Sequence, residues 1–272
     1  MGIFGGYFNS VGPGVPKDGP KKKGIALYFE LFIRHFWDFC KENIMYVITS
    51  IPMIAILYLT FSFFDVLSIA DADLHTAEII KVTVIALFVI LCGTGPSSAS
   101  MAYMMRCVTR EEHCFLWSDF FDKFKQNFKN TIILSILDYL LLIFVLPIAM
   151  RFYYMQYIGT GSLLWFAMFI LIVLIFAIYI MAHAYFYQFA ITFENNFKET
   201  FKNSVIMALT KMPMTILLAL IPTILTFVFT FVFQVTFVWI IIAVCWIAVM
   251  RYPLEFYAAR TIAKKLLETK DE

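Results

Sequence analysis

Long uncharged stretches alternate with short charged ones along the 272-residue chain. A helix needs roughly 20 mostly apolar residues to cross the hydrocarbon layer of a membrane. The last uncharged run, 212–250, would be about 58 Å long as one helix, too long for a single crossing, so we expect it to fold back near Gln234. The pattern predicts an all-α fold with six transmembrane helices, at about 44–64, 80–105, 131–150, 163–190, 213–232 and 236–255.

Composition supports a multi-pass membrane protein. Apolar residues make up 62% of the chain and charged residues only 15%, whereas soluble domains carry about 25% charged residues. Residues 1–23 are rich in glycine and proline and lack the apolar core of a secretory signal. We expect residues 1–26 to be a flexible cytoplasmic tail and residues 27–272 to form a single transmembrane domain.

The distribution of basic residues predicts the orientation of the chain. Six alternating spans place four segments on one side, and these hold 19 of the 21 Lys and Arg residues. The loop after the first span is acidic instead. Because basic residues favour the cytoplasmic side, both termini are expected to be cytoplasmic, in a multi-pass protein of the cell membrane. The four basic segments are 1–43, 106–130, 194–211 and 251–272.

A Phe/Lys motif recurs at an offset of 73 residues, ahead of the third and fifth spans. Phenylalanines four positions apart would face the acyl chains while lysines reach the headgroups, so we expect interfacial amphipathic helices at 118–130 and 195–209. With a looser copy before the first span, the motif suggests three helical hairpins, each preceded by such a helix. The recurrence of this motif has two explanations: a true duplication within the chain, or a pattern that helices entering a membrane commonly share. Candidate partner-binding residues are Phe120, Phe124, Phe128, Phe197 and Phe201.

Gly95, Pro96, Ser97 and Ser98 interrupt the cytoplasmic third of the second span. Pro96 has no N–H, so the carbonyl of Cys92 would lose its helical donor. In one interpretation the serines satisfy the backbone locally, and the small residues allow close helix packing. In the other, a broken helix turns carbonyls and hydroxyls toward a polar solute. We therefore treat these four residues as candidate substrate-binding residues.

Asp138 is the only carboxylate well inside an uncharged span. Such a group costs about 2.5–3.5 kcal/mol at the centre of a membrane helix, so it should face the bundle or a water-filled cavity. Two states are open for it: a protonated carboxyl group, or a carboxylate that accepts hydrogen bonds from Ser97, Ser98 or His183. His183 lies at a comparable depth on the fourth span, with Gln188 behind it, and both are also candidate substrate-binding residues. Helix packing is the competing explanation for His183.

The sequence contains no motif of a soluble enzyme: no Walker loop, HExxH or GxSxG. The spacing of Cys107, His113 and Cys114 matches no zinc site. Arg251 and Glu255, four residues apart, are expected to form a structural pair at the membrane edge. We expect no enzymatic activity, no cofactor, no metal and no nucleic-acid partner.

Several motifs together resemble the YesL-like family of bacterial integral membrane proteins. They are Asn43 with Ser50-Ile-Pro52, Gly95-Pro96 with Tyr103, and Phe120-Phe-Asp-Lys-Phe124 through Asn127-Phe-Lys-Asn130, and the resemblance covers roughly 30–215. That family has no established function. Its members occur in Gram-positive bacteria beside sugar ABC transporters, which implies a role in carbohydrate uptake. The long segment between Pro52 and Pro96 departs from the shorter members.

Two functions remain open. One is a non-enzymatic component of oligosaccharide transport, as auxiliary subunit or permease, with sugar ABC transporter subunits or other membrane proteins as partners. The other is a scaffold or regulatory protein without a transport path. In both, the lipid bilayer is the surrounding partner, and a homo-oligomer is compatible with the sequence.

Overall fold

The computed structural model describes residues 24–63, 74–157, 159, 162–193, 195–233 and 235–268, which form helices and short connections without a strand. The helices are α1 (Ile25–Arg34), α2 (Phe36–Phe63), α3 (Leu74–Leu91), α4 (Pro96–Arg110), α5 (Leu116–Tyr157), α6 (Leu163–Thr192), α7 (Phe197–Thr210), α8 (Met212–Val232), α9 (Val235–Ile241) and α10 (Ile247–Glu268), with a π-helical segment, η1, at Ile242–Trp246.

Five helices in this part of the chain are long and apolar enough to cross a membrane. Helices α3 and α4 meet at 58° across a short break and make a sixth span if they are counted together. The predicted span 80–105 is therefore divided into two helices. The final span combines α9, η1 and α10, and the reversal expected near Gln234 falls between the end of α8 and the start of α9. Gln234 itself lies outside the described residues.

The predicted interfacial helix at 118–130 is not a separate element. It is the first third of α5, whose 42 residues make a helix about 63 Å long, so α5 is far longer than the hydrocarbon layer is thick. The second predicted interfacial helix corresponds to α7, which is separate from both α6 and α8. The interfacial position of these segments and the arrangement as three hairpins remain predictions.

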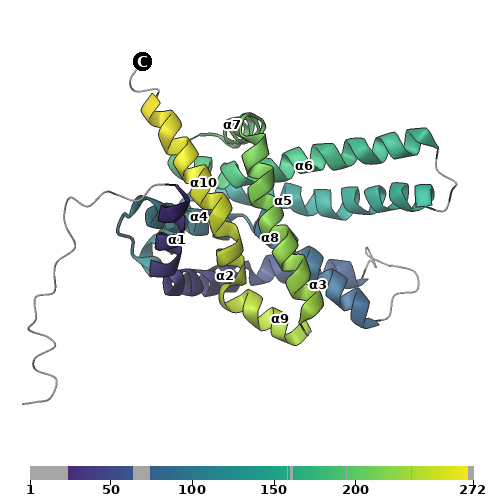
Figure 1. Cartoon of the computed structure of the whole chain (residues 1–272), viewed down its shortest axis with the longest axis horizontal. Coiled ribbons are helices and arrows are strands. Elements are labelled where there is room, and N and C mark those ends of the chain that lie inside the picture. Colours follow the sequence, from purple (N-terminus) through teal and green to yellow (C-terminus); the bar gives the residue numbers. More distant parts are fainter. Residues whose placement is uncertain are drawn as a thin grey trace, which may run out of the picture.

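Helix α4 occupies the centre of the molecule and contacts α1, α2, α5, α6 and α10 (Figure 1). Nearly all of its side chains are buried, although it is the least apolar part of the predicted spans. Its first half is built from serine and alanine, and such small side chains allow neighbouring helices to approach closely. The most polar membrane segment is therefore surrounded by protein.

The main apolar core lies between α2, α3 and the η1–α10 span, and includes Tyr46, Ile85 and Tyr252. Helix α1 packs against this core, with Tyr28 stacked on Tyr252 at a ring-centroid distance of 5.1 Å. Helix α1 begins at Ile25, so the predicted tail ends slightly too late. Residues 1–23 lie outside the described part.

The distal halves of α5 and α6 lie side by side and project from the remaining helices (Figure 1, right). No residue of the most apolar 18-residue window of α6 is buried within the chain. Leu171 and Leu174 on α6 and Phe144 on α5 are large exposed apolar side chains of this projecting part. In a membrane protein such a surface faces lipid or another transmembrane helix.

Candidate functional site

The break between α3 and α4 is made by two glycines rather than by a proline kink. Gly93 and Gly95 have φ values of +89° and +70°, a left-handed conformation that side chains with a Cβ rarely adopt. Pro96 follows as the first residue of α4, where a missing N–H costs no helical hydrogen bond. The chain therefore ends one helix and starts another, rather than bending a single helix.

Neighbouring side chains satisfy the backbone groups that this break exposes. The carbonyl of Cys92, expected to lack a donor, accepts a hydrogen bond from the hydroxyl of Tyr187 at 2.8 Å. The Thr94 N–H donates to Ser98 Oγ at 2.7 Å, and the Thr94 hydroxyl lies 2.6 Å from Ser50 Oγ. Backbone at membrane depth is tolerated only when protein or water fulfils its hydrogen bonds, and here protein does so.

Arg251 reaches the break from α10. One guanidinium nitrogen donates to Ser98 Oγ at 2.9 Å, and another donates to Glu255 Oε1 at 3.0 Å. The guanidinium carbon also lies 5.3 Å from the ring centroid of Tyr187 and 5.9 Å from that of Tyr46. The Arg251 and Glu255 side chains are 4% and 3% exposed, so the pair belongs to the interior of the bundle. Its position at the membrane edge stays a prediction.

Gln188 connects this ion pair to α4. Its amide nitrogen donates to Glu255 Oε2 at 2.8 Å and to the carbonyl of Ala102 at 3.0 Å. Both oxygens of Glu255 are thus engaged, one by Arg251 and one by Gln188. Removing one partner of a buried ion pair typically costs about 3–5 kcal/mol, because the other charge is then left uncompensated. We call Ser98, Gln188, Arg251 and Glu255 the arginine network.

Asp138 lies on the face of α5 that packs on the break, one turn beyond Ser135. A Cβ on Gly95 would collide with Ser135 Oγ, which shows how closely α5 approaches. Asp138 is 1% exposed, and Tyr179 donates to its Oδ1. His183 Nε2 lies 2.9 Å from the same oxygen. The partners of Asp138 are therefore Tyr179 and His183, not the serines of α4.

The contact between Asp138 and His183 leaves hydrogen-bonding capacity unused. Although Nε2 and Oδ1 are close, their orientation is not that of an aligned hydrogen bond, and Asp138 Oδ2 and both ring nitrogens of His183 have no hydrogen-bond partner among the described residues. Buried polar groups are nearly always paired. A carboxylate and an imidazole with open positions can bind a hydroxyl group, a water molecule or a proton.

Asn43 holds the π-helical segment η1 together. Its amide nitrogen donates to the carbonyls of Ile242 and Ala243 at 2.9 and 2.8 Å, and its oxygen accepts from the N–H of Ala248 at 2.8 Å. A π-helical turn displaces backbone groups from the usual ladder, and such turns are frequent at functional sites. The side chain fits this role because an amide both donates and accepts.

The candidate partner-binding phenylalanines differ in their surroundings. Phe120 is fully buried against Met45 and Met104, so it presents no docking surface, and its assignment as a partner contact is wrong. Phe197 and Phe201 are half-buried and pack against α4 and α6. Phe124 is also half-buried, and Phe128 is exposed. The sequence pattern identified the apolar stripe, but it could not show that helices of the same chain bury part of it.

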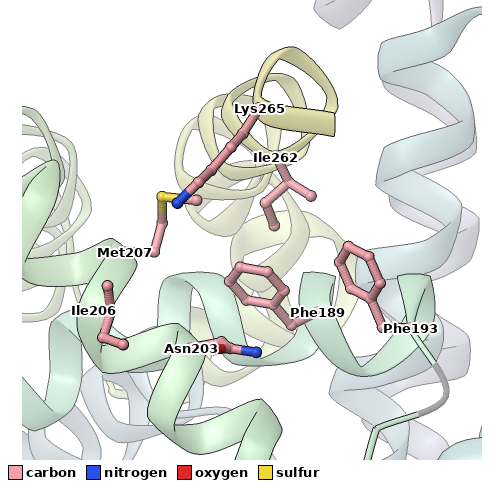
Figure 2. A pocket seen from close by; sticks show the side chains of 7 residues that line it. All are labelled: Phe189, Phe193, Asn203, Ile206, Met207, Ile262 and Lys265. Atoms are coloured by element: carbon pink, nitrogen blue, oxygen red, sulfur yellow. The ribbon is translucent and has the colours of Figure 1, made fainter. Parts of the chain in front are cut away.

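A hollow lies between α6, α7 and α10, and Figure 2 shows the side chains that line it. Its volume is about 240 Å³. Its lining is apolar except for Asn203 and Lys265. It contains none of the candidate substrate-binding residues. Among the described residues, no group of three or more His, Cys, Asp or Glu side chains is placed to hold a metal ion.

The sequence did not identify Arg251 and Glu255 as part of the site at the break, or Asn43 as the support of η1. The signal was present for the first two, because they fall within the span predicted at 236–255, where any charged residue is a functional candidate. Asn43 directly precedes the apolar stretch that begins at Ile44, so it fell outside the span predicted at 44–64. Ser97, although a candidate, is merely buried, whereas Ser98 makes the contacts.

The chain is similar over residues 43–149 to a family described as a protein of unknown function, DUF624. This range covers less than half of the chain, from α2 to α5, and contains every motif on which the resemblance noted from the sequence depends. It is shorter than the 30–215 expected. No curated protein and no solved structure matches the chain.

Proposed function

We propose that the protein is a non-enzymatic component of carbohydrate transport across a membrane, acting as an auxiliary subunit or as a permease. The observation that carries the proposal is the arginine network beside the broken α3–α4 span. Charged residues within membrane spans are costly and usually mark the route of a solute or ion. In transporters, broken helices at membrane depth likewise form the binding sites for solutes and ions.

The polar groups around the break suit a polyhydroxylated solute. Ser98 and Gln188 can donate or accept, Arg251 donates, and Asp138 with His183 has unfilled positions. Sugars are recognised by such combinations of donors and acceptors, because each hydroxyl can do both. The choice of carbohydrate as solute rests on the resemblance to YesL-like proteins carried by Asn43, Gly95-Pro96 and the following Phe/Lys/Asn helix.

Uptake of radiolabelled oligosaccharides in a deletion strain tests the proposal. Asp138→Asn keeps the size of the side chain but removes its charge, and we expect at least a tenfold loss of uptake at unchanged membrane abundance. The matched control is Asp122→Asn, an exposed carboxylate on the same helix, which should transport normally. Unchanged uptake in the deletion strain, with no transporter subunit co-purifying with the tagged protein, would remove the proposal.

A scaffold or regulatory protein is the second candidate, favoured by the unpacked apolar hairpin of α5 and α6. In this function the projecting hairpin is a surface for a transmembrane partner, and the arginine network only stabilises the fold. The double variant Ser98→Ala, Asp138→Asn separates the two functions. Normal uptake together with retained capture of a membrane partner would support the scaffold.

A further inference from the structure

A second polar site, apart from the α3–α4 break, lies where α1, α2, α4 and the start of α5 meet. A cavity of about 520 Å³ opens there between the segment 34–42 and the connection 111–114. We call it the Glu42 cavity. Its lining residues are Arg34, His35, Asp38, Glu42, Met104, Val108, Glu111, Glu112, His113, Cys114 and Leu116.

The charged groups at the mouth of the cavity are already neutralised in pairs. Arg34 lies 2.5 Å from Glu111. Asp38 lies 3.1 Å from His35 and 3.3 Å from Lys41. These residues are partly exposed, and pairs of this kind contribute little binding energy because solvent screens them.

Glu42 differs from every carboxylate at the mouth. It is 1% exposed, lines the cavity from α2, and its Oε1 has no hydrogen-bond partner. Burial and the neighbouring Glu255 both oppose a negative charge on Glu42, and Arg251, which favours it, is already paired with Glu255 at 3.0 Å. A buried carboxylate oxygen without a partner is costly, and a cation in the cavity would supply the missing partner.

The remaining lining restricts the kind of cation. No group of three His, Cys, Asp or Glu side chains in the described part of the chain is placed for a metal ion. The hydrogen bond of Cys114 with Cys107 raises the pKa of the Cys114 thiol, so this group stays uncharged. Met104, Val108 and Leu116 give the cavity an aliphatic wall, which suits a short hydrocarbon chain.

We propose that the Glu42 cavity binds an aliphatic amine as its ammonium ion, with the nitrogen at Glu42 and the alkyl chain against Met104, Val108 and Leu116. The ammonium group carries three donors and the carboxylate accepts, which makes a charge-assisted hydrogen bond. The source of the amine is a free diamine or the lysine side chain of a partner. This binding does not depend on carbohydrate transport.

Isothermal titration of the full chain in lipid nanodiscs tests the site, with butane-1,4-diamine as the probe and the uncharged butane-1,4-diol as its control. We expect the diamine to bind and the diol not to bind. Glu42→Gln should weaken diamine binding at least tenfold, whereas Glu199→Gln, which removes an exposed carboxylate on α7, should leave it unchanged. A lysine-containing tetrapeptide that binds more tightly than the diamine would identify a partner's lysine as the source.

Several results would overturn the proposal: no diamine binding to the wild-type protein, equal binding of the diol, full affinity in Glu42→Gln, or complete displacement by potassium ions at equal concentration. If Glu42→Gln does not fold, the comparison of diamine with diol on the wild-type protein decides the matter. Sugar uptake is not the readout, so failure of this site and failure of the transport proposal are distinguishable.

Discussion

Replacing Asn43 by alanine tests whether one amide side chain holds the π-helical turn of the last span. Asn43 makes three hydrogen bonds to the backbone of η1 and α10, at 2.8–2.9 Å, and is fully buried. Alanine removes all three bonds, and the Ala248 N–H loses the acceptor that Asn43 supplies. Because the Asn43 amide makes all three bonds, a single substitution tests them together.

The expected cost follows from the count of bonds. Hydrogen bonds between membrane helices average about 0.6 kcal/mol each, which gives roughly 2 kcal/mol for three bonds. A buried backbone group left unsatisfied costs about 1–3 kcal/mol, so the loss of an acceptor for the Ala248 N–H alone gives a similar value. We therefore expect Asn43→Ala to lower the free energy of unfolding by about 2–4 kcal/mol.

Reversible unfolding in mixed micelles, followed by circular dichroism, measures this change. The matched control is Asn127→Ala, because Asn127 makes a single hydrogen bond, at 3.1 Å, to the Lys123 carbonyl of its own helix. Alanine favours helix more than asparagine does, so this control should change stability by less than about 1 kcal/mol. If Asn43→Ala is no more destabilising than Asn127→Ala, the reasoning about η1 is refuted.

Three further predictions concern the break, the arginine network and α1. Gly95→Ala should destabilise more than Gly159→Ala: both residues have positive φ, but only at Gly95 would a Cβ meet α5, so the difference in unfolding free energy isolates the steric conflict. Glu255→Gln should cost about 3–5 kcal/mol by leaving Arg251 uncompensated, and adding Arg251→Met should restore part of that stability in the same assay. Burial raises the pKa of Tyr28 to about 12, from about 10 in an unfolded chain. The stabilisation from its neutral phenol is thus complete below pH 10 and lost as the pH rises toward 12, and the ultraviolet difference spectrum against Tyr28→Phe should show a single titration near pH 12.

The spans were predictable because their signal is local. Uncharged runs of sufficient length identified α6 and α8 to within two residues at each end, since a bilayer requires a minimum apolar length regardless of what packs nearby. Boundaries failed where polar residues continue a helix beyond the apolar stretch. Helix α5 is an example of this, because its lysine-rich start and its apolar span belong to one continuous helix.

The candidate site was predictable only in part. Asp138 and His183 were chosen separately as intramembrane polar residues, and the structure places them 2.9 Å apart. The partners of Ser98 and Gln188 could not be found, because Arg251 and Glu255 are more than sixty residues away in sequence. From the sequence alone, Arg251 and Glu255 could be recognised only as a pair four residues apart, because their other partners, Ser98 and Gln188, are distant in the chain.

The sequence by itself determined that this chain is a helical membrane protein and that the segment 93–98 interrupts a span, because apolar length and the backbone preferences of glycine and proline act within a few residues. Only the tertiary structure decided that this interruption lies against Arg251 and Tyr187 and that Asn43 bonds to the backbone of the last span. It also decided that Glu42 lines a cavity while its Oε1 has no hydrogen-bond partner. These contacts join positions far apart in the chain, and the free energy of a buried polar group depends on which neighbours satisfy it rather than on its position in the sequence.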